Sequence, residues 1–318
     1  MSRRPAPDAG FSASWLQQRE PFDALARRAA APRLQLQARL AGRRPPGGAA
    51  FRIIDLACGT GSNLRWLAPM IGGSQQWLVV DHDAALLQHW PQALAGRRTE
   101  PHAVEVAYGE GPAPDGMGDF QGRILQLTGD GFQAAVVRQR LDLAQSLADL
   151  PWRAAMLVTA SALLDLVSAA WLQQLVAAAT EARVALLMAL SVDGRHAWSP
   201  ADPDDAAVAA LFAAHQHRDK GFGGPALGAA AAPALVEALR VGGYQVHSAR
   251  SDWRLDGREG GAALAMQQAM VDGLGAAALE QAPAASARIR RWQQRRHALA
   301  PRSVLQVGHL DVLALPPR

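Results

Sequence analysis

The segment Asp55-Leu-Ala-Cys-Gly-Thr-Gly-Ser-Asn63 joins the end of a strand, a glycine turn and the start of a helix. The β-branched run that ends at Leu56 predicts the strand, and the serine and asparagine after the turn predict the helix start. Gly59 and Gly61 permit a sharp turn at the carboxyl end of the strand and let a ligand approach the backbone closely. The segment therefore predicts a nucleotide-binding turn.

The residues around this turn narrow the class of nucleotide. Asp81 lies 20 residues after Gly61 and ends the next apolar run, where a carboxylate can accept both hydroxyls of a ribose. A dinucleotide-binding turn would carry a third glycine, but Leu64 stands at that position counted from Gly59. The pattern thus departs from the dinucleotide fingerprint.

Strands and helices alternate along the rest of the chain. The later apolar runs have no polar alternation, which is typical of parallel strands that are covered on both faces. We therefore expect a doubly wound α/β sheet. Besides the first strand, strands are predicted over 76–81, 154–161, 184–192, 244–250 and 304–316, and helices over 84–95, 163–182, 233–242, 260–280 and 284–299.

Two regions are expected. Residues 1–48 are predicted to form an N-terminal helical cap and linker, with two short amphipathic helices interrupted near Pro32. The stretch 43–48 is rich in Pro and Gly, which predicts a linker between the helical cap and the sheet domain. Residues 49–318 are predicted to form the sheet domain.

Two insertions are expected in the sheet domain, at 96–131 and 193–232. The first is predicted to be a loop over 96–121 followed by a hairpin around Thr128-Gly-Asp-Gly131. The second is predicted to hold one helix and to lie over the strand ends as a lid.

Composition excludes several classes of protein. The chain has 318 residues, of which 49% are hydrophobic, so a packed core is expected. Its single cysteine, Cys58, excludes intramolecular disulfides and a multi-cysteine zinc site. No apolar run reaches the ~18 residues of a membrane span, and no apolar signal core follows the basic N-terminus. A cytoplasmic protein without a membrane partner or a bound metal is expected.

The charge pattern argues against a nucleic-acid partner. The formal net charge is only +4, and the basic residues are almost all arginines, scattered along the chain. Arginines that are scattered along a chain usually lie on the solvated surface. Lys220 is the one lysine in the sequence. Nothing in the sequence indicates the oligomeric state.

The turn with Asp55, together with Asp81, resembles the class I S-adenosylmethionine-dependent methyltransferases, whose first motif is an acid, a spacer and Gly-x-Gly. The resemblance covers roughly residues 51–192. It implies a Rossmann-like, mostly parallel seven-stranded sheet and S-adenosyl-L-methionine as the cofactor. It gives no substrate.

The resemblance also implies which residues hold the cofactor. The first acid and the turn would contact the amino-acid end of the cofactor, and Asp81 would bind its ribose. An acidic residue after the third strand would contact the adenine, and the end of the fourth strand would lie beside the methyl donor. The implied cofactor-binding residues are Asp55, Ala57, Gly59, Gly61, Asn63, Asp81, His82, Asp142, Leu143 and Ala160.

Two kinds of acceptor are disfavoured. Enzymes that methylate exocyclic amino groups of bases commonly carry Asn/Asp-Pro-Pro-aromatic after the fourth strand, and this chain has Ser161-Ala-Leu-Leu-Asp165 there. Carbon-5 methylation of pyrimidines usually needs a cysteine nucleophile, and Cys58 lies in the cofactor turn. We expect a small acidic metabolite that is methylated on an oxygen or nitrogen nucleophile.

Two residues are candidates for a general base. Asp165 lies just after the fourth strand, close to an apolar helix, although an acid in a first helical turn can equally serve the helix dipole. His215 lies in the second insertion and could accept a proton at neutral pH.

Three residues are candidates for acceptor binding. Lys220 offers a compact point charge for a carboxylate or phosphate. Arg19 lies in the N-terminal helix that is expected to close over the cofactor. Trp198 could wall an aromatic acceptor, although core packing is the commoner role of tryptophan.

Two other functions remain open from the sequence. An RNA methyltransferase is the alternative, because Arg288, Arg291 and Arg295 would share one face of the helix at 287–300. A non-catalytic protein that keeps the cofactor fold is the other, and the intact turn argues against it.

Overall fold

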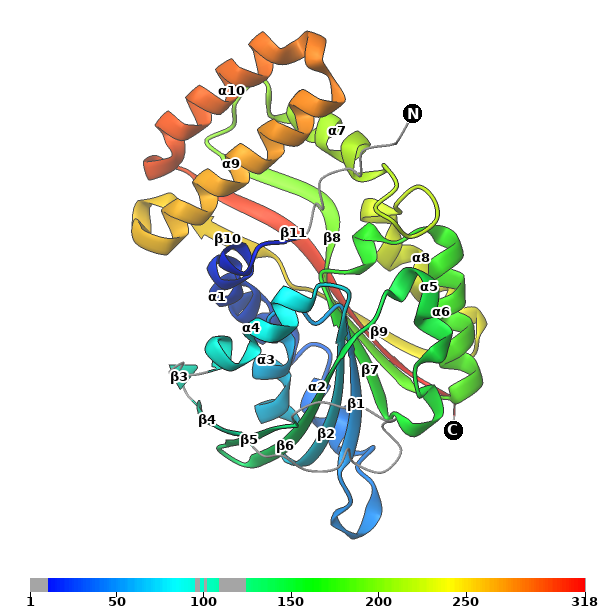
Figure 1. The fold of residues 1–318 in the computed structure, drawn as a ribbon. Coiled ribbons are helices and arrows are strands. Elements are labelled where there is room, and N and C mark those ends of the chain that lie inside the picture. Colours follow the sequence, from blue (N-terminus) through cyan, green and yellow to red (C-terminus); the bar gives the residue numbers. More distant parts are fainter. Residues whose placement is uncertain (1–10, 95–97, 100–101, 109–123, 318) are drawn as a thin grey trace, which may run out of the picture.

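The computed structural model describes residues 11–94, 98–99, 102–108 and 124–317. A central sheet carries helices on both faces, and a second group of helices lies beyond its upper edge (Figure 1). The helices α1 to α4 cover one face, and α5, α6 and α8 cover the other. The expected α/β architecture is confirmed.

The bounds of the elements follow. The helices are α1 (Ala13–Ala30), α2 (Leu36–Ala41), α3 (Ser62–Ile71), α4 (Ala84–Leu94), α5 (Leu143–Ser146), α6 (Ala169–Ala182), α7 (Asp205–Gln216), α8 (Ala231–Val241), α9 (Gly261–Gln281) and α10 (Ser286–Leu299). The strands are β1 (Phe51–Leu56), β2 (Gly73–Asp81), β3 (Arg98–Thr99), β4 (His102–Tyr108), β5 (Leu125–Gly129), β6 (Phe132–Arg140), β7 (Leu157–Ser161), β8 (Ala185–Ser199), β9 (Gln245–Arg250), β10 (Trp253–Asp256) and β11 (Val304–Leu315).

The sheet is mixed rather than mostly parallel. Its order is β10-β11-β8-β7-β1-β2-β6-β5-β4-β3, with β9 also pairing with β11. The strands β6, β2, β1, β7 and β8 run parallel to one another. The antiparallel strands at both sides correct the expected seven-stranded sheet, because hairpin and return strands extend it beyond the parallel centre.

The first predicted insertion is partly a set of strands. The hairpin around Thr128–Gly131 is confirmed, since β5 pairs antiparallel with β6. The strand β4 lies within the stretch predicted as a loop and pairs with β5. The prediction of a loop over 96–121 is therefore wrong for residues 102–108, where β5 offers an open edge to a further strand, and for 98–99, which form β3 beside β4.

The second predicted insertion starts later than expected. The strand β8 continues through 193–199 beside β11, with two register shifts and a positive φ of 53° at Leu190. These irregularities let a long antiparallel pair bend and twist without ending. The prediction that this strand ends at Val192 is wrong, and the chain continues from it to α7, which packs against α9.

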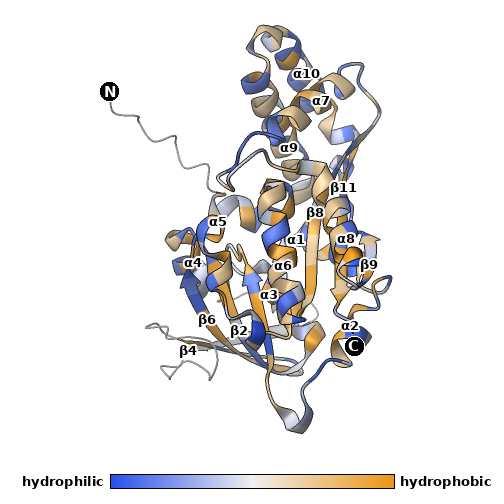
Figure 2. Cartoon of the chain, turned by 90° about the vertical axis from the view of Figure 1, so that its right-hand side faces the viewer, coloured by the Kyte–Doolittle hydropathy of each residue, from blue (hydrophilic) through white to orange (hydrophobic). Residues whose placement is uncertain are grey.

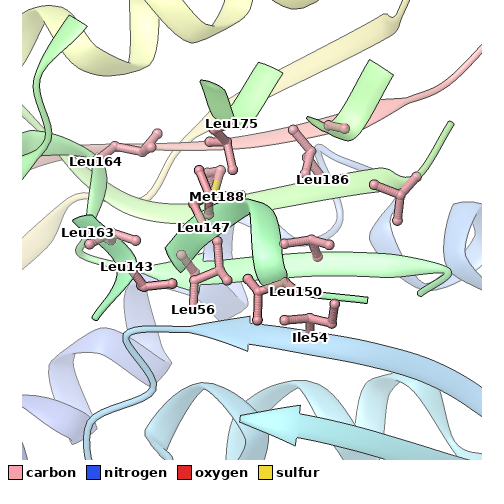
Figure 3. Close-up of a cluster of buried hydrophobic side chains, with 14 of the residues drawn as sticks. Ile54, Leu56, Leu143, Leu147, Leu150, Leu163, Leu164, Leu175, Leu186 and Met188 are labelled. Atoms are coloured by element: carbon pink, nitrogen blue, oxygen red, sulfur yellow. The ribbon is translucent and has the colours of Figure 1, made fainter. Parts of the chain in front are cut away.

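The core explains why these segments fold as they do. Figure 3 shows side chains from β1, β8, α5 and α6 that pack together on one face of the sheet, among them Leu56, Leu143, Leu175 and Met188. Hydrophobic colour runs along β8 in Figure 2. Burial on both faces accounts for strands that read as continuous apolar runs.

The N-terminal helices belong to the α3 face. The predicted interruption near Pro32 is confirmed, because α1 ends at Ala30 and α2 begins at Leu36. The Arg65 guanidinium on α3 forms two hydrogen bonds with Glu20 of α1, at 2.6 and 2.7 Å. Among the described residues, no helix is both long enough and apolar enough to cross a membrane.

Candidate functional site

The turn between β1 and α3 lies at the carboxyl edge of the parallel strands. Its backbone has positive φ values at Ala57, Gly59 and Gly61, of 50°, 53° and 86°. A Cβ at Gly61 would lie 2.9 Å from the Trp90 ring, so glycine is required there for both its conformation and its space. The alanine at 57 keeps the same left-handed conformation at a steric cost.

Asp81 closes this turn from the end of β2. Its Oδ2 accepts a hydrogen bond from the Gly59 N–H at 2.8 Å, and its Oδ1 accepts one from the Asp83 N–H at 3.0 Å. The side chain is buried, whereas the neighbouring His82 is exposed, with Nδ1 3.4 Å from Asp81 Oδ1. The arrangement brings the predicted ribose acid directly against the glycine turn.

Asp55 and Asn63 form a buried polar pair below the turn. The Asn63 amide donates to Asp55 Oδ1 at 2.6 Å and to Thr159 Oγ1 at 3.2 Å, and the Thr159 hydroxyl donates to the Leu187 carbonyl at 2.8 Å. Asp55 Oδ2 and Asn63 Oδ1 have no hydrogen-bond donor. Two acceptors without a donor suit a cationic ligand group that brings its own donors.

Burial sets the protonation of Asp55. Loss of solvent raises the pKa of this carboxyl to about 7, while the Asn63 hydrogen bond and the charge of Arg27 lower it and Asp81 raises it. The carboxyl is fully enclosed, so its charge depends on the few groups around it.

The remaining predicted cofactor residues lie along the same edge. Asp142 is exposed and caps α5, where it accepts from the Ala144 N–H at 3.0 Å. The sheet brings it near the ribose acid, because the Leu141 N–H donates to the Asp81 carbonyl at 2.9 Å. Leu143 and Ala160 point into the core, so only their backbone or edges could meet a ligand.

Asp165 is an unpaired carboxylate beyond β7. It lies in a short 3-10 turn (Leu164–Leu166) before α6, not in the helix itself, whose N-cap is Ser168. Its Oδ1 is buried without a hydrogen-bond partner. Burial raises the pKa of this carboxyl to about 6. A hydrogen bond with its own backbone and the charges of Arg19 and Lys220 act in the opposite direction and lower the pKa. A carboxyl tuned toward neutral pH suits a proton acceptor.

Arg19 is held firmly on α1. Its Nε and Nη2 donate to the Asp23 carboxylate at 2.9 and 3.2 Å, and its guanidinium carbon lies 5.0 Å from the centre of the Trp253 ring. The Trp253 indole N–H also donates to Asp23, at 3.0 Å. This arrangement fixes the direction of the arginine, and its charge reaches Asp165.

The second cation near Asp165 is Lys220. It is half-buried, and its ammonium has no hydrogen bond or ion pair among the described residues. The loop that carries it is fastened to the start of α6, since the Ser168 hydroxyl donates to the Phe222 carbonyl at 2.7 Å and the Phe222 ring packs edge-on against Trp171.

Two predicted site residues are engaged elsewhere. His215 Nε2 lies 3.1 Å from Glu280 on α9, so the structure gives it a partner other than Asp165. Trp198 packs edge-on against Trp292 and under the Arg296 guanidinium, at 4.5 Å. Core packing therefore accounts for Trp198 without an acceptor.

The sequence analysis missed three residues at this site: Asp23, Trp253 and His309. His309 is buried on β11, where Nδ1 donates to the Val307 carbonyl at 3.2 Å and the ring lies 5.2 Å from the Trp253 ring. Burial and the charge of Arg19 lower its pKa to about 3. The spacing of Arg19 and Asp23, four residues apart on one helix, could have indicated their pairing. Nothing local in the sequence marks the other two.

No group of three or more His, Cys, Asp or Glu side chains within the described ranges could hold a metal ion. The described site therefore consists of a glycine turn with two acids, and of a nearby carboxylate with two cations.

Comparison with known proteins gives similarity of fold at low identity. No protein-family model matches the chain, and no curated protein matches it. A cyclopropane-fatty-acyl-phospholipid synthase-like protein from Lactobacillus casei is 14% identical, with 97% of this chain and 95% of that chain covered and a TM-score of 0.45. A mycolic acid cyclopropane synthase in complex with SAH and CTAB is 11% identical, with 90% and 85% covered and a TM-score of 0.40.

An arsenic(III) S-adenosylmethionine methyltransferase from Chlamydomonas reinhardtii is 12% identical, with 92% of this chain and 73% of that chain covered and a TM-score of 0.37. At these identities and TM-scores the likeness assigns no substrate.

Proposed function

We propose that this chain is an S-adenosyl-L-methionine-dependent methyltransferase. The observation that carries the proposal is the β1–α3 turn, where Asp81 is hydrogen-bonded to Gly59 and where Asp55 and Asn63 offer two acceptors without donors. A nucleoside with a cationic amino-acid end supplies a ribose for the first acid and an ammonium for the second pair. The residues present thus fit this cofactor.

The cofactor supplies a methyl group on a sulfonium, which is an activated leaving group, so the protein mainly has to orient the acceptor. With that cofactor bound, an oxygen or nitrogen of the acceptor would take the methyl carbon as the bond from that carbon to sulfur broke. Asp165 takes the proton that the nucleophile loses. Its unpaired oxygen and raised pKa support this role.

The acceptor in this proposal is a small molecule with an acidic group. Arg19 and Lys220 are the cations whose charges reach Asp165. Arg19 is fixed by Asp23 and Trp253, and Lys220 has no protein partner among the described residues. A carboxylate or phosphate on the acceptor would find both charges beside the proposed base.

The alternative, an RNA methyltransferase, has less support. Two of the three arginines on the basic face of α10 pair with acids of the α7 region: Arg288 with Asp204 at 2.6 Å, and Arg295 with Asp202 at 2.6 Å. Charges that are neutralised within the protein contribute little to phosphate binding. Binding of transfer RNA that weakens steeply with salt would favour this alternative.

The proposal is tested by calorimetric titration with S-adenosylmethionine and S-adenosylhomocysteine, followed by incubation with a metabolite extract and methyl-labelled cofactor. Saturable binding and transfer of label to a small acidic compound are expected. Absence of binding of either nucleoside would contradict the proposed cofactor. Binding without transfer to any compound would favour a non-catalytic protein.

A further inference from the structure

Gly59 lies in the middle of the turn between β1 and α3. It is partly exposed, whereas its neighbours Cys58 and Thr60 are buried. Its φ of 53° lies in the left-handed region, as do those of Ala57 and Gly61. Glycine has the widest choice of backbone conformations, so a turn of this kind keeps one shape only when contacts hold it.

Side chains hold both backbone polar groups of Gly59. Its N–H donates to Asp81 Oδ2 at 2.8 Å, and its carbonyl accepts a hydrogen bond from the Trp90 indole N–H at 2.8 Å. Asp81 ends β2 and Trp90 belongs to α4. The turn is therefore fixed to two later elements of the chain.

The Trp90 ring also packs against the second glycine of the turn. A Cβ at Gly61 would lie 2.9 Å from this ring, and a Cβ at Gly59 would lie 3.0 Å from Cδ1 of Leu16 on α1. The Trp90 side chain is fully buried. Trp90 thus contacts both glycines, one through a hydrogen bond and the other through its ring.

We propose that Trp90 is a positioning residue that fixes the turn from Gly59 to Gly61 in its ligand-binding form before the nucleoside binds. This inference rests on the proposed function, which makes the turn the binding place of the nucleoside. Trp90 does not touch the ligand, because its side chain is fully buried. It acts through the carbonyl of Gly59 and the space beside Gly61.

The physical reason is the difference between the two hydrogen bonds at Gly59. The Asp81 carboxylate is also the proposed acceptor for the ribose hydroxyls, so it serves the turn and the ligand together. The Trp90 indole has a single N–H, and that donor is given to the Gly59 carbonyl alone. Without this bond, the turn would have to become ordered when the nucleoside binds, and the ordering would weaken the affinity.

The test uses two variants that lack the indole N–H. One is Trp90→Phe, and the other replaces Trp90 site-specifically by benzothienylalanine, which keeps the ring shape with sulfur in place of the N–H. Trp152→Phe is the matched control, because the buried Trp152 indole N–H donates to the Leu147 carbonyl at 2.9 Å. Calorimetric titration with S-adenosylhomocysteine measures affinity, amide hydrogen exchange of the unliganded chain measures opening of the turn, and urea unfolding measures stability.

Both Trp90 variants should bind S-adenosylhomocysteine about five- to tenfold more weakly than the wild-type chain, as expected for the loss of one hydrogen bond. The amides of residues 59–63 should exchange faster in these variants, while those of β1 keep the wild-type rate. Saturation with S-adenosylhomocysteine should restore the slow exchange. Trp152→Phe should lose stability to a similar degree and keep the wild-type affinity.

Two outcomes would overturn the inference. One is wild-type affinity in the benzothienylalanine variant or in folded Trp90→Phe. The other is an equal loss of affinity in Trp152→Phe, with faster exchange throughout β1 and β2 in the Trp90 variants, which would indicate that Trp90 only stabilises the fold. Failure of the wild-type chain to bind S-adenosylhomocysteine would instead contradict the proposed function.

Discussion

Asp81 and Asp165 show how position along one sheet edge gives two carboxylates different properties. Asp81 is engaged by two backbone N–H groups at 2.8 and 3.0 Å, so it is a fixed part of the turn. Asp165 has a buried oxygen with no donor and a pKa raised by burial to about 6. The first suits ligand binding, and the second suits proton transfer.

Replacing Asp81 should weaken nucleoside binding. In Asp81→Ala, the Gly59 N–H loses its acceptor and the ribose loses a charged partner. The free energy of S-adenosylhomocysteine binding should therefore become less favourable by about 1.5–3 kcal/mol. Calorimetric titration measures this change. Asp83→Ala is the matched control, because the Asp83 carboxylate caps α4 by accepting a hydrogen bond from the Ala85 N–H. This variant should bind S-adenosylhomocysteine with nearly the wild-type affinity.

Replacing Asp165 should affect turnover rather than cofactor affinity. Asp165→Asn should lower the rate about 10²- to 10⁴-fold, the usual contribution of a general base. In the wild-type chain the rate should rise with pH through about 6, because only the deprotonated carboxylate accepts a proton. Methyl transfer to the compound found in the extract provides the measurement.

The exposed Asp149→Asn variant serves as the control and should retain the wild-type rate. Full activity of Asp165→Asn, or a rate that falls as the pH rises through 6, would show that Asp165 has only a structural role.

At the scale of elements, α1 is the helix that joins the two parts of the site. Its residues Arg19, Asp23 and Arg27 are spaced by four and therefore share one face. Asp23 and Arg27 are buried, and the charge of Arg19 acts to lower the pKa of Asp165. The Glu20–Arg65 pair holds α1 to α3, and Arg65 also donates to the Thr60 carbonyl of the turn at 2.7 Å.

Removing one partner of this buried pair should be strongly destabilising. Arg65→Met removes the buried guanidinium that forms two hydrogen bonds with the Glu20 carboxylate, so the free energy of unfolding should fall by about 3–5 kcal/mol. The double variant Glu20→Gln/Arg65→Met should recover part of that loss, since the buried carboxylate is neutralised together with its partner. Urea unfolding of the single and double variants measures both values, and additive losses would argue against a coupled pair.

At the scale of the whole molecule, α7, α9 and α10 form a layer beyond the sheet, reached by the extended strands β8 and β11 (Figure 1). Arg296 of α10 is fully buried in this layer. It forms an ion pair with Asp205 of α7, donates to the Pro200 carbonyl at 2.9 Å and stacks on Trp198 of β8. One side chain of α10 thus holds the end of β8 and the start of α7, which lie more than 90 positions earlier in the sequence.

Because this ion pair is buried, it should contribute strongly to the free energy of unfolding. Arg296→Met should lower the free energy of unfolding by about 3–5 kcal/mol, because it leaves the Asp205 carboxylate without its buried partner. The control is Arg153→Met, which breaks an exposed pair with Glu181 and should change stability by only about 0–1 kcal/mol. Thermal and urea unfolding give both values, and equal effects would contradict the assigned role.

Several features of the fold could be predicted from local chemistry. The glycine turn, the parallel strands around it and the break between α1 and α2 depend on backbone conformation and apolar periodicity, which neighbouring residues fix. The hairpin at Thr128–Gly131 follows from its turn residues in the same way. The acids Asp55 and Asp81 were found because they sit at fixed distances from the turn.

What only the tertiary structure decided depends on contacts between distant segments. The length of β8 is set by its pairing with β11, which no local pattern encodes. The engagement of His215 by Glu280 and of Trp198 by Arg296 joins residues at least 65 positions apart. The burial that raises the pKa of Asp165 comes from the packing of the whole chain, because desolvation depends on every group that excludes water and not on the residue itself.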